Sequence, residues 1–198
     1  MAVASKILLH DKRLKGSLGF ASYTFPDVIP FSINEKSSLR TVFKGLADFA
    51  GTFDNTKQLD IYCHGYESQT PKYGGLGLQL GKDDLLPSNV NDLGLLLWGQ
   101  FHRIVIYACS AADSSYAKID PAADGQKLMQ SLADSSGAEV VAADATQYYY
   151  PIPIAGIYQE DGMGRFIISS PGRFRYFNGS INIIYAFCRC RVLVRRCD

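Results

Sequence analysis

Two stretches of the chain decide its fold: residues 58–65 (QLDIYCHG) and residues 103–112 (RIVIYACSAA). Each is a short run rich in β-branched and aromatic residues that ends at small or polar ones, as strands do. The second run is almost continuously apolar, which is typical of a strand buried on both faces of a sheet. We therefore predict two interior strands, the first stopped by His64 and Gly65 and the second stopped by Ser110.

Segments with helical periodicity flank these strands. Apolar residues recur at three- and four-residue spacing in residues 35–50, 89–99 and 124–136. Further strands are predicted for residues 6–10 and 138–143. A repeated order of strand, helix and strand predicts an α/β fold with a mostly parallel central sheet and helices on both faces.

The remaining parts of the chain give weaker signals. Residues 16–33 combine glycine, proline and aromatic residues and predict a loop or an irregular edge strand. Short or edge strands are predicted for residues 76–80, 165–169 and 181–187. We expect a single domain over residues 1–198, with its core at about 35–170 and edge elements or extensions at 1–34 and 171–198.

The composition restricts the partners. The 198 residues carry a formal net charge of +1, so no overall field attracts nucleic acid or an anionic membrane, and we predict neither as a partner. No apolar run approaches the roughly 20 residues of a membrane-spanning helix, and the first apolar stretch is too short for a signal peptide. A cytoplasmic location, or export without a standard signal peptide, is expected. The sequence makes no prediction of the oligomeric state.

The five cysteines are an odd number, which favours free thiols over a disulfide framework. Cys188, Cys190 and Cys197 form a C-x-C-x6-C pattern, but no histidine lies near them in the sequence and a fourth metal ligand is missing. We predict neither a metal nor an organic cofactor.

Three residues with catalytic chemistry fall at the ends of predicted strands: His64, Cys109 and Asp144. The carboxyl ends of parallel strands share one edge of a sheet, where the sites of such folds gather. A cysteine nucleophile needs a nearby imidazole that stabilises the thiolate and protonates the leaving amine. His64 and Cys109 meet this need if their strands are neighbours, and the backbone NH groups of Gly65 and Cys109 are candidate oxyanion donors.

An apolar strand that ends in His-Gly, followed by one that ends in Ala-Cys, resembles the pattern of caspase-like cysteine peptidases. Residues 59–147 also resemble the caspase-like domain of unknown function found in large bacterial surface proteins, through HG, LGLQLGKDDL, IVIYACSAA and GAEVVAADATQ. A more distant similarity is to the self-processing cysteine protease domains of large bacterial toxins. The resemblance covers about half of the chain. It implies a three-layer sandwich with His64 as general acid and base, Cys109 as nucleophile and Gly65 as oxyanion donor.

One departure from this resemblance bears on specificity. Two residues before the nucleophile, caspases carry glutamine, and legumains and metacaspases carry an acidic residue that helps to bind the P1 side chain, whereas this chain has Tyr107. An apolar or small P1 residue is therefore as compatible as a charged one. Tyr107, Asp144 and Tyr148 are the candidate substrate-binding residues, although Asp144 is equally suited to capping a turn and Tyr148 to core packing.

The hypothesis that follows is a cysteine endopeptidase that acts on protein or peptide substrates and is a candidate for self-processing. One alternative is a catalytically silent caspase-like protein-interaction module, in which Cys109 is only the last core position of its strand. Another is a cysteine-dependent acyl transfer or amide hydrolysis on a non-peptide substrate. The other conspicuous side chains are expected to pack in the core or to be solvated: Cys63, His10, His102, Asp113 and the basic run Lys12, Arg13 and Lys15.

Overall fold

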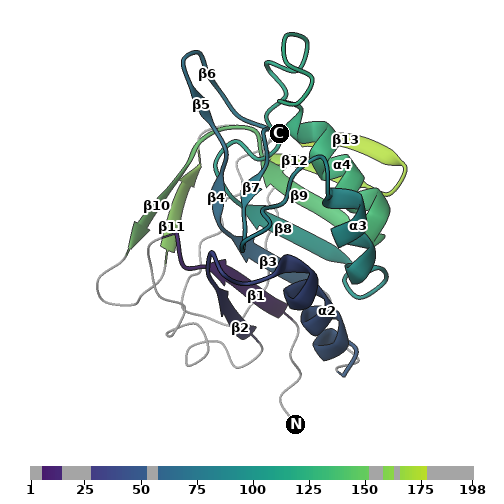
Figure 1. The fold of residues 1–198 in the computed structure, drawn as a ribbon. Helices are drawn as coiled ribbons and strands as arrows, with labels where there is room; N and C mark the ends of the chain where they lie inside the picture. Colours follow the sequence, from purple (N-terminus) through teal and green to yellow (C-terminus); the bar gives the residue numbers. More distant parts are fainter. Residues whose placement is uncertain (1–5, 15–27, 53–57, 152–157, 163–165, 178–198) are drawn as a thin grey trace, which may run out of the picture.

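The computed structural model describes residues 6–14, 28–52, 58–151, 158–162 and 166–177, with 147–151, 158–162, 166 and 173–177 described as backbone only. Their centre is a seven-stranded sheet in the order β13-β12-β9-β8-β3-β1-β2 (Figure 1). Its strands are β1 (Lys6–Asp11), β2 (Val28–Ile33), β3 (Gln58–Tyr62), β8 (Arg103–Tyr107), β9 (Glu139–Ala143), β12 (Phe166–Ser170) and β13 (Arg173–Phe177). The strands from β9 to β2 in this order are parallel to one another. β12 pairs antiparallel with β9, and β13 pairs antiparallel with β12. The predicted α/β fold with a mostly parallel central sheet is confirmed.

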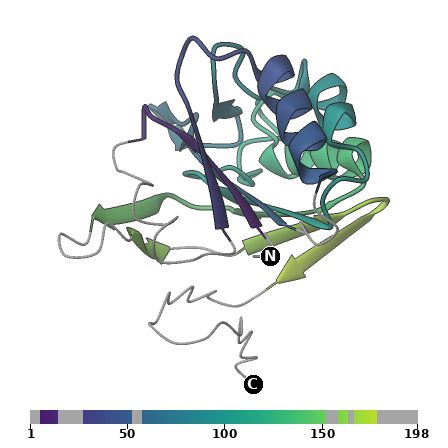
Figure 2. The same ribbon diagram turned by 90° about the horizontal axis from the view of Figure 1, so that it is seen from below.

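The described helices all pack on one face of this sheet (Figure 2). They are α2 (Leu39–Ala50), α3 (Val90–Gly94), which continues as the 3-10 helix η1 (Leu95–Leu97), and α4 (Gly125–Ser136). In α2, the residues Leu39, Phe43, Leu46 and Ala50 form one buried stripe, as the helical periodicity predicts. The second expected layer of helices, on the opposite face, is not found among the residues that the structure describes.

The strands that lead to His64 and Cys109 are buried on both faces, which explains their continuous apolar runs. Leu59 and Ile61 of β3 belong to the core beneath the helices. Tyr62 joins a second cluster on the other face, together with Tyr107 of β8. Residues that complete this second cluster are Leu8, Leu14, Val105, Val141 and Ala143.

Short antiparallel pairs follow the carboxyl ends of the parallel strands. β4 (His64–Gly65) pairs with β7 (Leu78–Gln79), β5 (Ser68–Gln69) with β6 (Lys72–Tyr73), and β10 (Gln147–Pro151) with β11 (Tyr158–Gly162). The sequence patterns did not predict β11 (YQEDG) or β13 (RFRYF). In β11, the Glu, Asp and Gly residues are uncommon in strands. The strand predicted for residues 181–187 lies outside the described residues.

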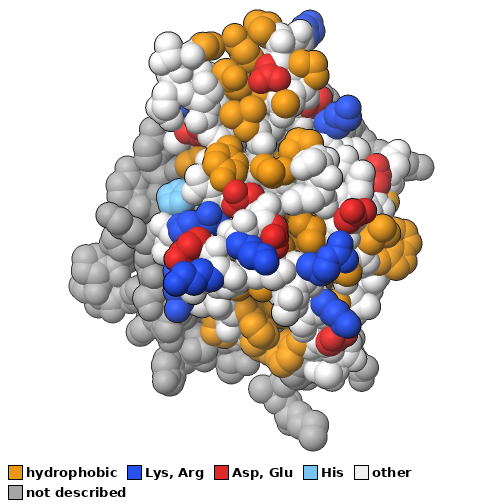
Figure 3. All heavy atoms as spheres, in the orientation of Figure 1, with side chains coloured by type: hydrophobic (Ala, Val, Ile, Leu, Met, Phe, Trp, Pro, Cys, Tyr) orange, Lys and Arg blue, Asp and Glu red, His pale blue; other side chains and the backbone are white. Residues whose placement is uncertain are grey.

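The surface mixes charges of both signs. On the face shown in Figure 3, Lys, Arg, Asp and Glu side chains lie interspersed with apolar ones, in keeping with the net charge of +1. None of the described helices is both long enough and apolar enough to cross a lipid bilayer.

Candidate active site

His64 and Cys109 leave the sheet at the same edge. Their strands, β3 and β8, are parallel neighbours, and Tyr62 pairs with Tyr107 at the last position of the ladder. The amide of Cys63 donates to the carbonyl oxygen of Tyr107 at 3.2 Å, so the hydrogen bonding between the two segments extends one residue past the end of β3. The condition that the sequence sets for the dyad, that the two strands be neighbours, is therefore met.

The backbone of Gly65 lies directly against the backbone of Cys109. A Cβ atom at position 65 would overlap the carbonyl oxygen of Cys109 and would lie 3.3 Å from its nitrogen. Glycine alone fits there, because every other residue carries that atom. The pairing of β4 with β7, which sets His64 opposite Gln79 and Gly65 opposite Leu78, fixes this segment beside the sheet.

The ring of His64 is oriented by a backbone carbonyl. Its Nε2 lies 3.2 Å from the carbonyl oxygen of Arg13, in the turn that follows β1. Because a carbonyl oxygen only accepts hydrogen bonds, Nε2 carries the hydrogen in this contact and Nδ1 is the acceptor of the neutral ring. A catalytic base next to a nucleophile is commonly oriented by such a third group.

The side chain of Arg13 is held by a bidentate ion pair with Asp11. Nε donates to Oδ1 at 3.0 Å and Nη2 donates to Oδ2 at 2.7 Å, and the side chain of Asp11 is fully buried. Burial acts to raise the pKa of Asp11, but hydrogen bonds from Arg13 and Gly81 outweigh it, so the pKa is lowered. The expectation of a solvated basic run is wrong for Arg13, because its guanidinium neutralises a buried carboxylate.

A second carboxylate extends this network. Asp84 accepts a hydrogen bond from Nη2 of Arg13 at 3.4 Å and one from the hydroxyl of Tyr66 at 2.5 Å. It also accepts from the amide of Leu80 at 3.0 Å. The hydrogen bond to Asp84, together with burial, raises the pKa of Tyr66. The network therefore joins the ends of β1, β4 and β7 next to His64.

Cys109 is followed by a turn with an uncommon backbone conformation. Ser110 has a φ of 48°, in the left-handed region that residues other than glycine rarely adopt. Its amide donates to the carbonyl oxygen of Ala145 at 2.9 Å, and its own carbonyl accepts from the amide of Gly75 at 2.9 Å. Its hydroxyl donates to Oε1 of Glu67 at 2.6 Å. Backbone strain of this kind clusters at functional sites.

The two described cysteines differ in environment. Cys63 is fully buried in the core, as expected, and burial raises the pKa of its thiol. Cys109 is half-buried and lies beyond the end of its strand. Of these two residues, Cys109 is the more exposed.

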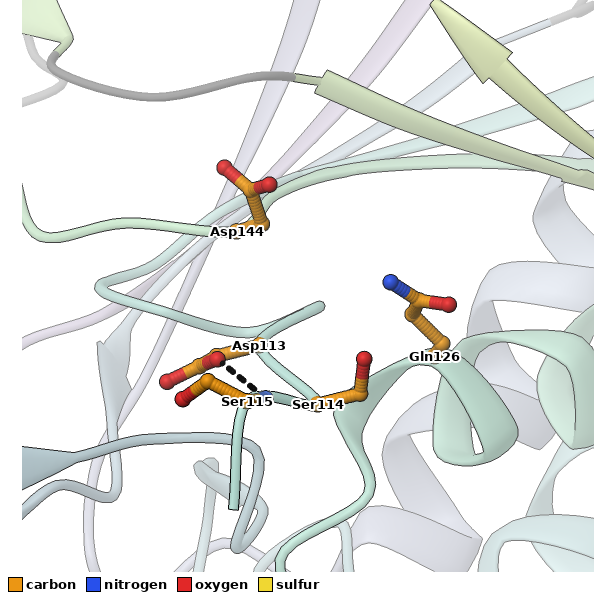
Figure 4. Close-up of a pocket in the computed structure, with 5 residues that line it drawn as sticks. All are labelled: Asp113, Ser114, Ser115, Gln126 and Asp144. Atoms are coloured by element: carbon orange, nitrogen blue, oxygen red, sulfur yellow. Dashed lines mark hydrogen bonds between the residues drawn. The ribbon is translucent and has the colours of Figure 1, made fainter. Parts of the chain in front are cut away.

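A polar pocket of about 350 Å³ opens beside the loop that follows Cys109. It is lined by Asp113, Ser114, Ser115, Gln126 and Asp144. Asp144 follows β9 and lies across from Ser114 and Gln126 (Figure 4). Asp113 is a partly exposed loop residue, and its carboxylate also orders the loop: Oδ1 accepts from the amide of Ser115 at 2.8 Å and Oδ2 from the amide of Gly74 at 2.9 Å.

The candidate substrate-binding residues lie in three different surroundings. Tyr107 is 3% exposed and stacks on Tyr62 with ring centroids 4.3 Å apart, so its contacts are those of a core residue. Asp144 lines the polar pocket. The side chain of Tyr148 lies outside the described part of the chain, as do the three cysteines of the C-x-C-x6-C pattern.

The other two histidines are not part of the candidate dyad. His10 is buried, its Nε2 lies 2.8 Å from the carbonyl oxygen of Leu14, and burial lowers its pKa. His102 is exposed. Within the described ranges, no group of three or more His, Cys, Asp or Glu side chains is placed to hold a metal ion.

Three carboxylates around the dyad were missed by the sequence patterns: Asp11, Glu67 and Asp84. Each lies within a few residues after a predicted strand. A survey of charged residues at strand ends would have found all three, because loops at the carboxyl edge of a parallel sheet converge. Their partners, by contrast, come from distant segments that no local pattern connects.

Comparison with known proteins gives no match. The chain matches no protein-family model, no curated protein and no solved structure. The function is therefore argued from the geometry of this site.

Proposed function

We propose that the protein is a cysteine endopeptidase of caspase-like architecture, with Cys109 as nucleophile and His64 as general acid and base. The observation that carries the proposal is the backbone contact between Gly65 and Cys109 at the ends of two adjacent parallel strands. His64 precedes Gly65 and has its ring oriented by Arg13, and Cys109 is the more exposed of the two described thiols.

In the proposed reaction, the thiol proton of Cys109 passes to His64 and the thiolate attacks the carbonyl carbon of the scissile peptide bond. The C–N bond then breaks, and His64 gives that proton to the leaving amine. Water attacks the resulting thioester, the carboxylic acid leaves, and a proton from the water returns to the sulfur. One peptide bond and one water molecule become one amine and one acid, and Cys109 is regenerated.

The hydrogen bond between His64 and Arg13 supports this role for the ring. With Nε2 bound to the carbonyl oxygen of Arg13, the neutral ring has Nδ1 as its acceptor for the thiol proton. The carbonyl dipole also stabilises the imidazolium that then forms, because its negative end faces the positive ring.

The backbone NH groups of Gly65 and Cys109 are the proposed oxyanion donors. The backbones of these two residues are in contact, which is the observation that supports this assignment. Backbone donors need no rearrangement when negative charge develops on the substrate carbonyl oxygen, which is why they stabilise it effectively.

The pocket lined by Asp144 is the proposed site for a substrate side chain. Two of its lining residues are carboxylates, Asp113 and Asp144, and its other lining residues are neutral. Charge complementarity favours a Lys or Arg side chain in such a pocket. Because Tyr107 is a core residue, it is not proposed as a P1 contact.

The proposal is tested with wild type, Cys109→Ala and His64→Ala, using an electrophilic thiol probe read by mass spectrometry and a library of cleavable peptides at neutral pH. Cys63→Ala, which removes the buried neighbouring thiol, is the matched control. We expect rapid labelling of Cys109 in wild type and Cys63→Ala, slower labelling in His64→Ala, and peptide cleavage only where both dyad residues are present. If Cys109 reacts no faster than an ordinary thiol and no peptide is cut, the silent interaction module replaces the peptidase.

A further inference from the structure

We propose that Glu67 is a positioning residue, which acts on Cys109 by holding the turn that follows it. This inference rests on the proposed function for its meaning, but its central measurement does not require that any peptide be cleaved.

Glu67 connects three segments that are far apart in the sequence. Its Oε1 accepts a hydrogen bond from the hydroxyl of Ser110 at 2.6 Å and a second one from the hydroxyl of Thr146 at 2.9 Å. Ser110 follows the candidate nucleophile, and Thr146 follows β9. Glu67 itself follows β4, which carries His64 and Gly65. One carboxylate oxygen therefore joins the segments after β4, β8 and β9.

Ser110 is a residue that needs such support. Its φ of 48° is unfavourable for a side chain with a Cβ, and conformations of this kind persist only where the surroundings enforce them. Ser110 is 5% exposed, so water has little access to take the place of Glu67 as a partner of its hydroxyl. Hydrogen bonds to a carboxylate are also stronger than those between neutral groups.

The conformation of Ser110 determines where the preceding peptide group points. Rotation about φ of Ser110 turns the peptide plane that joins it to Cys109, and with it the carbonyl oxygen of Cys109. That oxygen is the atom against which the backbone of Gly65 packs. A change in the turn is therefore transmitted to the contact between Gly65 and Cys109, on which the proposed dyad and oxyanion donors depend.

The test compares wild type with Glu67→Ala, Glu67→Gln, Ser110→Ala and the double variant Glu67→Ala/Ser110→Ala. Glu139→Ala is the matched control, because Glu139 pairs with Arg103 at the opposite end of the same strands. Three quantities are measured. The first is amide hydrogen exchange at Ser110 and Gly75, whose NH groups donate to the carbonyl oxygens of Ala145 and Ser110 respectively. The others are the rate of Cys109 alkylation, and kcat and KM for a cleaved peptide. Melting temperatures show which variants remain folded.

We expect Glu67→Ala to speed amide exchange at Ser110 and Gly75 and to slow alkylation of Cys109 by about tenfold, with kcat falling more than KM rises. Glu67→Gln keeps an acceptor oxygen and is expected to stay close to wild type. The double variant is expected to be no slower than Glu67→Ala, because Glu67→Ala already removes the hydrogen bond that Ser110→Ala removes.

Unchanged exchange in Glu67→Ala, equal effects in Glu139→Ala, or rate losses that multiply in the double variant would each overturn the positioning role. If wild type cleaves no peptide while exchange still responds to Glu67→Ala, the peptidase proposal fails and the role of Glu67 in the turn stands. The experiment thus distinguishes a failure of the peptidase proposal from a failure of the positioning role of Glu67.

Discussion

The Nε2 of His64 lies 3.2 Å from the carbonyl oxygen of Arg13, so the candidate base takes its orientation from a backbone group and not from a third catalytic side chain. The position of that carbonyl depends on the turn after β1, which the ion pair between Arg13 and Asp11 stabilises. A substitution at Asp11 should therefore change the orientation of the His64 ring, although Asp11 acts on that ring only through Arg13.

Replacement of Asp11 by alanine is expected to lower the free energy of unfolding by about 2 kcal/mol or more, because it leaves the guanidinium of Arg13 without its buried partner. It should also slow alkylation of Cys109. Denaturant titration and probe labelling measure the two effects. Glu139→Ala, which breaks the exposed pair with Arg103, is the control and should cost at most about 1 kcal/mol. Equal costs for the two variants would contradict the assigned role of Asp11.

Gly65→Ala is expected to destabilise the protein by about 1–3 kcal/mol and to abolish rapid labelling of Cys109, because the added Cβ overlaps the Cys109 carbonyl. Gly45→Ala is the control. Gly45 lies on α2, where an added Cβ atom would meet no other atom within 4 Å, so alanine there should stabilise the helix by about 1 kcal/mol. Opposite signs in denaturant titrations are the expected result, and a tolerated alanine at position 65 would disprove the backbone contact.

The stability of the protein should depend on pH through His10. Its pKa is lowered from 6.5 by burial, so the unfolded chain binds a proton that the folded chain does not, and the free energy of unfolding falls as the pH drops below about 6.5. His10→Gln keeps a donor for the Leu14 carbonyl and should reduce this slope. The free energy of unfolding is measured at several pH values from about 8 to 5. His102→Gln, which replaces an exposed histidine, is the control. The same slope in His10→Gln as in wild type would show that His10 is not responsible.

Asp144→Asn is expected to raise KM for peptides with Lys or Arg at the selective position, while kcat changes little, because the pocket loses a negative charge. Peptides with neutral residues at that position should be affected less. Asp92→Asn, on the exposed surface of α3, is the control. If Asp144→Asn changes KM equally for peptides with charged and with neutral residues at that position, the pocket is not the binding site of the substrate side chain.

Much of the fold could be predicted because the strands and helices carry local periodic signals. The runs before His64 and Cys109 are apolar on both faces, and α2 has its apolar residues on one stripe, so each pattern follows from burial alone. β11 was not predicted because Glu, Asp and Gly disfavour a strand, and it forms by pairing with β10. β13 was also missed, and it forms by antiparallel pairing with β12.

The candidate site was only partly predictable for the same reason. His64, Cys109 and Gly65 lie directly at strand ends, where a parallel sheet gathers functional residues. Arg13 and Glu67, in contrast, gain their roles from partners 51 and 43 residues away in the sequence, and such contacts leave no local pattern. The position of Tyr107 before the candidate nucleophile suggests substrate binding. In the structure its ring instead stacks on Tyr62, on the face of the sheet away from the described helices.

The pairing of β3 with β8 has a consequence for the newly made chain. His64 and Cys109 come together only through these two strands, which a helix and several turns separate in the sequence. A ribosome-bound or misfolded chain that has not paired them holds an ordinary cysteine thiol. In the proposed enzyme, activation of the Cys109 thiol would thus require correct folding. A chain that has failed to fold would lack the thiolate that attacks peptide bonds.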